Sequence, residues 1–349
     1  MANELIGSSL IGGSLIGGSL IGEGTYGCIF DTPLKCKNKV GELDKNVLHK
    51  LISKDEALDE FNITKIIRTI PLWRNYFAVA ESICIPSPAQ DDPELLKCSQ
   101  FKEYKLSEMR ILSMRHGGYT SDMFRFPLYE FNIMSFFIHL LEGCSLLTLK
   151  GIVHNDIHSR NIVIDKYNVP RFIDFNLSLN IFNYVEFNLK YSLKYKQQTP
   201  DFLLINAIAL RDDYESVIQD IVYKRSVNKK IRNLLNYTNN EMVADLNECY
   251  MKIDSFKKGD IHKWFKYYWR KIDTWAIVVY IIEIILKLSI YPVFVHSFSK
   301  YKDTIKSVLK KMCHFNPDKR IDAIQALHIL KPDSFIIKKY GEKWLKDII

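Results

Sequence analysis

The sequence contains no pair of cysteines at C-x-x-C spacing, although seven cysteines occur among its 349 residues. Zinc-ribbon and thioredoxin-like redox motifs are therefore excluded. The odd number and wide spacing of the cysteines predict unpaired thiols in a reducing compartment, so we expect a cytoplasmic protein. The seven are Cys28, Cys36, Cys84, Cys98, Cys144, Cys249 and Cys313.

Long uninterrupted hydrophobic runs are also missing, and the first residues have no basic region of the kind that opens a secretory signal. The longest apolar stretch, residues 274–295, is interrupted by Glu283 and Lys287 and contains Pro292 near its end. Because charges at the centre of a bilayer are costly, this stretch is predicted to be a buried core helix. No membrane association is expected.

Blocks of five or six like charges are absent as well. The formal charge of +8 is spread along the chain and fits an anionic partner or merely a solubilising surface. With 47% hydrophobic and 25% charged residues, the composition is that of a globular protein and not of a disordered one.

The pattern of residues changes along the chain. A five-residue SLIGG repeat predicts a flexible tail over residues 1–18. Short β-like runs and one helix, residues 54–70, follow, and helical spacing dominates from about Phe131. We predict an α+β fold with a small β-rich N-terminal lobe, residues 19–115, and a larger helical lobe, residues 116–349.

The end of the repeat forms a G-x-G-x-x-G string that runs into a strand-like segment. Glycines at these positions let backbone N–H groups approach phosphate oxygens. A Rossmann motif has the same spacing, but there a helix follows. We therefore predict a strand-turn-strand flap over a nucleotide phosphate. The nucleotide-binding candidates are Ile21, Gly22, Glu23, Gly24, Thr25, Tyr26, Gly27, Cys28 and Ile29.

The most informative segment is IVHNDIHSRNIVIDKYNVPRFIDFN, residues 152–176. Two apolar runs in it are separated by a turn, which predicts a β-hairpin between Asn161 and Asp174. Such a hairpin brings an amide and a carboxylate to the same end of two strands. Hard oxygen ligands of this kind suit Mg²⁺ that carries phosphate oxygens.

This segment resembles the catalytic region of the protein kinase superfamily, and the resemblance covers roughly residues 19–330. HNDIHSRN is similar to the H-R-D-x-x-x-x-N loop, and DFN to D-F-G. The resemblance implies that Asp156 accepts the proton of the acceptor hydroxyl, while Asn161 and Asp174 hold Mg²⁺, or Mn²⁺, against ATP. Lys50 in VLHK takes the place of the lysine that pairs with the α- and β-phosphates.

Three later motifs extend the resemblance. Thr199-Pro200-Asp201 resembles A-P-E, the Asp273-Thr274-Trp275 string resembles the D-x-W that opens a buried helix, and NPDKR resembles P-x-x-R. In this family the last arginine pairs with the A-P-E carboxylate. The resemblance therefore predicts an ion pair between Asp201 and Arg320.

Several residues depart from the family pattern. Asn155 replaces the arginine that clasps an activation-loop phosphate in many kinases, so we expect activity without that phosphate. His158 is similar to a residue of aminoglycoside-type phosphotransferases and leaves the acceptor class open. Asn176 replaces the D-F-G glycine, and asparagine tolerates a left-handed backbone.

The acidic partner of Lys50 is ambiguous. Glu56 and Glu60 both lie in the predicted helix, and we favour Glu60 because it sits deeper in the helix beside an apolar anchor. A shifted strand would place Lys45 or Lys39 at the position of Lys50.

An insertion relative to the family pattern is predicted at about residues 205–270. Aromatic residues near its end are expected to pack onto the larger lobe, and nucleic-acid binding is not expected. They are Trp264, Phe265, Tyr267, Tyr268 and Trp269.

These observations favour an ATP-dependent protein kinase with an unidentified protein substrate, and the resemblance to the superfamily implies serine or threonine as the acceptor. The divergent lobes and the insertion resemble kinases of large nucleocytoplasmic DNA viruses, which would place the protein in the host cytoplasm or the virion. Two alternatives stay open: a small-molecule phosphotransferase and a catalytically inactive kinase fold that serves as a binding scaffold.

Overall fold

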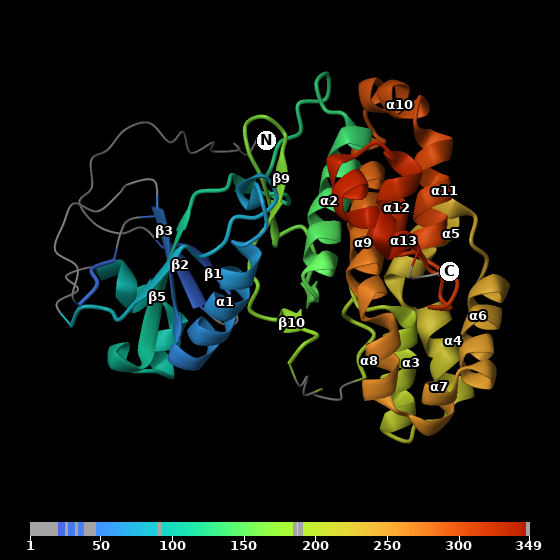
Figure 1. The fold of residues 1–349 in the computed structure, drawn as a ribbon, viewed down its shortest axis with the longest axis horizontal. Coiled ribbons are helices and arrows are strands. Elements are labelled where there is room, and N and C mark those ends of the chain that lie inside the picture. Colours follow the sequence, from blue (N-terminus) through green and yellow to red (C-terminus); the bar gives the residue numbers. More distant parts are fainter. Residues whose placement is uncertain are drawn as a thin grey trace, which may run out of the picture. The chain divides into compact units, whose positions relative to one another are not determined.

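The computed structural model describes residues 20–24, 27–31, 34–37, 47–88, 93–183, 187 and 191–346. The chain divides into two compact units, which are described separately (Figure 1). Unit 1 comprises Met1–Leu58 and Ala80–His116, and unit 2 comprises Asp59–Val79 and Gly117–Ile349. The predicted tail and the alternative lysines, Lys39 and Lys45, lie outside the described residues.

Unit 1 is built on a five-stranded antiparallel sheet of order β1-β2-β3-β5-β4. β1 and β2 pair directly, with Glu23 opposite Cys28, so the predicted strand-turn-strand is confirmed. The predicted strand around Lys50 is β3, which lies between β2 and β5. The strands are β1 Leu20–Glu23, β2 Gly27–Phe30, β3 Val47–Ser53, β4 Ser82–Cys84 and β5 Met109–Arg115.

Short 3-10 helices and the start of α1 complete unit 1. α1, Lys54–Ile67, ends three residues before the predicted helix end, and two acidic residues in its first turn suit a helix N-terminus. It begins in unit 1 and ends in unit 2. The 3-10 helices are η2 Pro93–Lys97, η3 Ser99–Lys102 and η4 Leu106–Glu108.

Two disulfides cross-link unit 1, so the prediction of unpaired thiols is wrong for four cysteines. Cys28 pairs with Cys98, and Cys36 pairs with Cys84. The partners are 70 and 48 residues apart and meet only because the sheet folds, which spacing alone does not reveal. Disulfides are rare in reducing compartments, so the cysteine argument for a cytoplasmic protein no longer holds.

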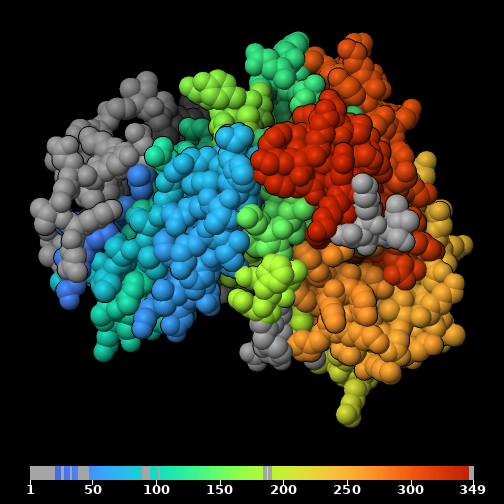
Figure 2. Space-filling view, in the orientation of Figure 1, coloured from blue at the N-terminus to red at the C-terminus, as the bar shows by residue number. Residues whose placement is uncertain are grey.

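Unit 2 is mostly helical. Its helices are η1 Trp73–Asn75, α2 Ile133–Leu149, α3 Pro200–Ala209, α4 Tyr214–Lys224, α5 Ser226–Leu235, α6 Asn239–Lys252, α7 Asp254–Lys258, α8 Ile261–Tyr268, η5 Trp269–Lys271, α9 Ile272–Leu288, α10 Pro292–Ser299, α11 Lys302–Met312, α12 Ala323–Leu330, η6 Ile337–Gly341 and α13 Glu342–Lys346. In the view of Figure 2, the C-terminal elements, coloured orange to red, form much of the visible surface of this unit.

Two small sheets carry the loops of interest in unit 2. One has the order β6-β8-β9, and the other pairs β10 with β7. The strands are β6 Tyr119–Thr120, β7 Ile152–Val153, β8 Ile162–Ile164, β9 Pro170–Phe172 and β10 Leu179–Asn180.

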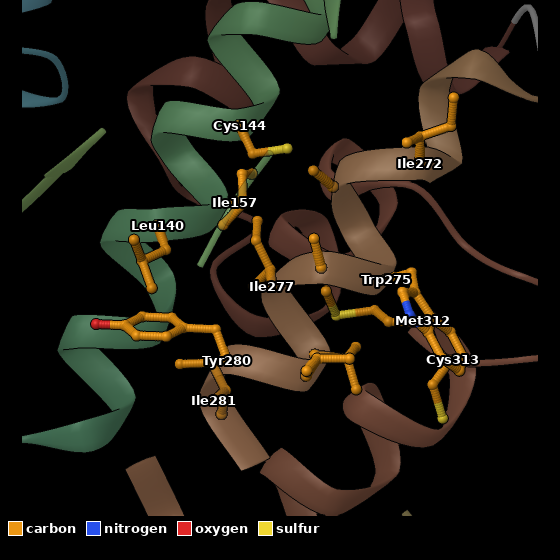
Figure 3. Packing of buried hydrophobic residues seen from close by; sticks show 14 of the residues in the cluster. Leu140, Cys144, Ile157, Ile272, Trp275, Ile277, Tyr280, Ile281, Met312 and Cys313 are labelled. Carbon is orange, nitrogen blue, oxygen red and sulfur yellow. The ribbon is translucent and has the colours of Figure 1, made fainter. Parts of the chain in front are cut away.

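The hydrophobic core of unit 2 surrounds α9. Trp275, Ile277 and Ile281 on α9 are completely buried and pack among side chains of α2 and α11 (Figure 3). Burying a large apolar side chain contributes about 1.5–3 kcal/mol, so this helix is a major source of stability. The predicted core helix is confirmed, and no helix among the described residues has the length and apolarity to cross a membrane.

The predicted insertion is helical and packs onto unit 2. It contains α4 to α8 between α3 and α9. Of its five clustered aromatic residues, four are buried and only Tyr267 is exposed. The expectation that these rings pack onto the larger lobe is confirmed for four of them and wrong for Tyr267.

Candidate active site

The loop after β7 is held by the first turn of α9. Asp273 accepts hydrogen bonds from the backbone N–H groups of His154 at 2.7 Å and Asn155 at 2.8 Å. Burial raises the pKa of the Asp273 carboxyl, and these interactions with the loop oppose the rise only in part. Asn155 adopts a left-handed conformation, φ 66°, which asparagine tolerates well. Asp273 therefore positions this loop, a role that the sequence analysis missed.

His154 serves as a scaffold for the same loop. Its ring is completely buried, and its Nε2 lies 3.0 Å from the carbonyl oxygen of Ile173. The ring centroid is 4.6 Å from that of Phe175. The histidine thus ties the loop to the D-F-N segment instead of facing a substrate.

Asp156 carries the half-buried carboxylate of the loop, and three side chains surround it. Asn161 Nδ2 donates to Oδ2 at 2.9 Å, Gln197 Nε2 donates to Oδ1 at 3.0 Å, and His158 Nε2 lies 3.4 Å from Oδ2. Burial alone would raise the pKa of this carboxyl, but the neighbours, His158 and His154 first among them, lower it below the ordinary value. Asp156 is therefore an anion at neutral pH. Gln197 was not identified from the sequence.

Strands β8 and β9 form the predicted hairpin, with Ile162 opposite Phe172. Just beyond the paired strands, Ile173 N donates to the carbonyl oxygen of Asn161 at 3.1 Å. Asp174 follows immediately in the chain. The structure therefore brings Asn161 and Asp174 to the same end of the hairpin, as the spacing predicts.

The donor types of these two residues suit Mg²⁺ that also binds phosphate. The Asn161 amide nitrogen is used by Asp156, which leaves the amide oxygen as its ligand atom. Within the described ranges, no three His, Cys, Asp or Glu side chains cluster as a metal site. One amide oxygen and one carboxylate are too few for an all-protein cage but suit Mg²⁺, which takes its other ligands from water and substrate phosphates.

The turn in the D-F-N segment differs from the expectation. Asn176 does not have a positive φ; the left-handed residue is Asp174, φ 60°. The turn therefore precedes Phe175, whose buried ring packs against His154 and Phe77.

In unit 1, the three glycines of the phosphate loop have different environments. A Cβ at Gly27 would lie 2.7 Å from the carbonyl oxygen of Leu51, so strand pairing requires glycine there. At Gly22 and Gly24 the nearest atoms would be 3.9 Å away. Packing does not require these two glycines, and the Gly24 N–H donates to the carbonyl oxygen of Gly27 at 2.9 Å. Thr25 and Tyr26 of the motif lie outside the described residues.

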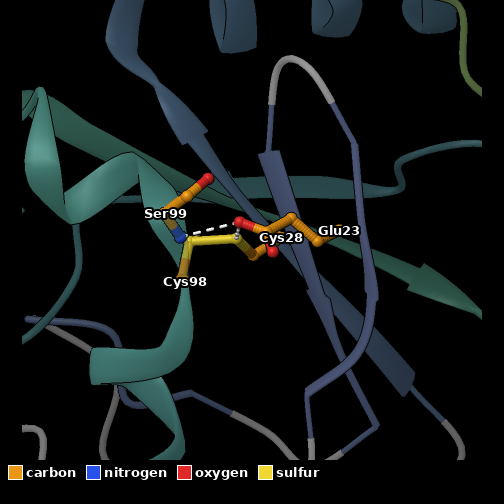
Figure 4. The surroundings of a disulfide bond; sticks show 4 residues. All are labelled: Glu23, Cys28, Cys98 and Ser99. Carbon is orange, nitrogen blue, oxygen red and sulfur yellow. Dashed lines mark hydrogen bonds between the residues drawn. A yellow bond between two sulfur atoms is a disulfide. The ribbon is translucent and has the colours of Figure 1, made fainter.

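The loop is tied to the η3 segment. Glu23 Oε1 accepts a hydrogen bond from Ser99 N at 2.7 Å, next to the disulfide between Cys28 and Cys98 (Figure 4). Cys28 is thus a cross-link behind the loop, whereas the sequence analysis interpreted it only as a nucleotide-binding neighbour.

Lys50 and Glu60 are both almost completely buried, with exposed fractions of 5% and 3%. Lys50 lies opposite Ile29 of β2 and Leu112 of β5. Glu56 instead accepts a hydrogen bond from the Ser53 hydroxyl at 2.8 Å at the start of α1. The preference for Glu60 over Glu56 stays a prediction.

The predicted ion pair between Asp201 and Arg320 is present. Arg320 Nη2 donates to Asp201 Oδ1 at 2.6 Å, and both side chains are buried. The second carboxylate oxygen accepts a hydrogen bond from Trp264 Nε1 at 3.0 Å. The insertion therefore shares the carboxylate at the start of α3.

Comparisons with known proteins add a distant similarity. No family model matches the chain. Fibroblast growth factor receptor 2 of Dugesia japonica is 23% identical over 197 residues, which cover 55% of this chain and 22% of the receptor. The chain thus spans less than a quarter of that relative's length. The similarity, together with the presence of a small β-rich unit and a larger, mostly helical one, is consistent with a kinase-like fold. The resemblance to viral kinases and the cellular compartment stay predictions.

Proposed function

We propose that the protein transfers the γ-phosphoryl group of ATP to a hydroxyl group of a protein, with serine or threonine as the acceptor. Two observations carry the proposal. Asn161 Nδ2 donates to Asp156 Oδ2 at 2.9 Å. The β8–β9 hairpin brings Asp174 to the same end of the two strands as Asn161. An ionised carboxylate next to an amide and a second carboxylate suits phosphoryl transfer, in which positioning and charge stabilisation dominate.

Each residue has a role in this proposal. Asp156 orients the acceptor hydroxyl and accepts its proton. Asn161 and Asp174 hold Mg²⁺, which neutralises phosphate charge when it is bound. The resemblance assigns binding of the α- and β-phosphates to Lys50, which lies in unit 1.

Phosphoryl transfer to a small molecule is the second candidate, because His158 lies 3.4 Å from the Asp156 carboxylate. A histidine at this place resembles aminoglycoside-type phosphotransferases. The motifs around Asp273 and Arg320 resemble protein kinases; Asp273 holds the loop that carries Asp156, and Arg320 pairs with Asp201 at the start of α3.

The test is incubation with radiolabelled ATP and Mg²⁺ in the presence of casein, myelin basic protein or an aminoglycoside. We expect labelled protein, with phosphoserine or phosphothreonine after acid hydrolysis. Asp156→Asn should reduce labelling by at least about 100-fold, because loss of a positioned base removes that much rate.

The outcomes separate the candidates. Label only on the aminoglycoside would support the small-molecule enzyme, and label on tyrosine would overturn the acceptor assignment. If the protein binds ATP but labels nothing, the scaffold alternative replaces the proposal.

A further inference from the structure

Gln197 is the most distant residue in sequence that contacts the Asp156 carboxylate. Its amide Nε2 donates to Oδ1 at 3.0 Å, whereas Asn161 donates to the other oxygen, Oδ2. The two amides together therefore fix both oxygens of the carboxylate. A carboxylate with donors on both oxygens is restricted in rotation, which matters for a group that has to meet a hydroxyl at a defined angle.

The backbone around Gln197 is held by one arginine from the insertion. Arg225 lies at the junction of α4 and α5, and its Nη2 donates to the carbonyl oxygens of Tyr195, Lys196 and Gln198 at 3.1, 3.2 and 2.8 Å. Its exposed fraction is only 3%. The residues that flank Gln197 on both sides are thus attached to the same guanidinium.

Two further contacts fix the same segment. Trp275 Nε1 donates to the carbonyl oxygen of Lys196 at 3.0 Å, and Lys196 Nζ pairs with Glu283 at 2.5 Å. The Arg225 guanidinium also lies 5.6 Å from the centroid of the Trp275 ring. The 195–198 segment is therefore anchored to α9 and to the insertion.

Burying Arg225 only to fill space would cost more free energy than burying an apolar side chain of similar volume. Its Nε and Nη1 have no hydrogen-bond partner within the described part of the chain. A buried charge with unsatisfied donors destabilises a fold compared with an apolar residue of similar volume. What Arg225 does supply is a fixed position for three backbone carbonyl oxygens around Gln197, those of Tyr195, Lys196 and Gln198.

We propose that Gln197 is a positioning residue for Asp156 and that Arg225, supplied by the insertion, acts through it. The insertion thereby becomes a part of the catalytic apparatus and not only a packing layer. This inference rests on the proposed function, since it needs Asp156 to be the catalytic carboxylate.

The test compares Gln197→Met with Gln198→Met. Methionine keeps the length of glutamine but removes the donor. Gln198 is the matched control, because its side-chain oxygen has no hydrogen-bond partner among the residues described. We expect Gln197→Met to lower kcat about tenfold, the effect of losing one oriented hydrogen bond. The KM for ATP and the melting temperature should stay at the wild-type values, and Gln198→Met should behave like wild type.

Arg225→Met tests the second step, because methionine removes the guanidinium group that donates to the three carbonyl oxygens. We expect a fall in kcat of similar size. In the double variant with Gln197→Met, kcat should fall no further than in either single variant, because both changes remove the same positioning.

The possible failures are distinguishable. If Asp156→Asn is inactive but Gln197→Met keeps wild-type kcat, the proposed function stands and the positioning role is wrong. The positioning role would also be overturned if Gln197→Met and Gln198→Met lowered kcat equally. The same holds if the fall in kcat of the double variant at Gln197 and Arg225 equalled the product of the two single falls. If the wild-type protein transfers no phosphate, the proposed function and this inference fall together.

Discussion

Removal of the Arg320 guanidinium should strongly destabilise unit 2. The exposed fractions of the Arg320 and Asp201 side chains are 1% and 0%. In Arg320→Met, the Asp201 carboxylate would keep only the neutral donor Trp264 Nε1. A buried charge that loses its partner costs about 3–5 kcal/mol, because the desolvation penalty is no longer offset.

The measurement is urea unfolding followed by tryptophan fluorescence, since Trp264 and Trp275 are completely buried in this unit. A loss of that size corresponds to a fall of about 1–2 M in the urea midpoint. Lys263→Met is the control, because it breaks an ion pair whose side chains are 41% and 50% exposed and should have no measurable effect.

A double variant sharpens the reasoning. Asp201→Asn combined with Arg320→Met removes both charges, so no buried charge is left unpaired and part of the stability should return. A midpoint for Arg320→Met that equals the wild-type value, or a double variant that is less stable than either single one, would refute the argument from burial.

Three other predictions concern stability. Replacing both Cys28 and Cys98 with alanine should destabilise unit 1 by about 2–4 kcal/mol, because the cross-link spans 70 residues and restricts the unfolded chain. If the variant has the same urea midpoint as the oxidised wild type, the disulfide is not formed. Gly27→Ala should lower the free energy of unfolding by about 1–3 kcal/mol, because the added Cβ clashes with the carbonyl oxygen of Leu51 in β3. Gly22→Ala is the control and should leave stability unchanged, because its Cβ has room. Equal melting temperatures for the two variants would contradict this prediction. Burial alone would raise the pKa of Asp245, but hydrogen bonds from a histidine, a tyrosine and a lysine hold it well below its ordinary value of 3.8. Because the pKa is lower in the folded than in the unfolded state, the stabilisation is complete above about pH 4 and is lost as the pH falls toward the folded-state pKa. Asp245→Asn should therefore flatten acid denaturation below about pH 4, and an unchanged acid profile would show that Asp245 has no such coupling.

Local features of the fold were predictable because they depend on neighbouring residues. The strand around Lys50, the helix that starts at Lys54 and the hairpin between Asn161 and Asp174 follow from short apolar runs and turns. The core position of α9 follows from an apolar run with too many charges for a bilayer. The Asp201–Arg320 pair links distant positions, and only the resemblance to a family predicted it.

By itself, the sequence determined that Asn161 and Asp174 share one hairpin, because strand pairing over a dozen residues leaves little choice. Only the tertiary structure decided which distant residues hold the candidate residues in place. The contact of Gln197 with Asp156, the clamp by Arg225 and the cross-link between Cys28 and Cys98 join segments that are 27 to 70 residues apart. No periodicity encodes such contacts, since they depend on how helices and strands pack once they have formed.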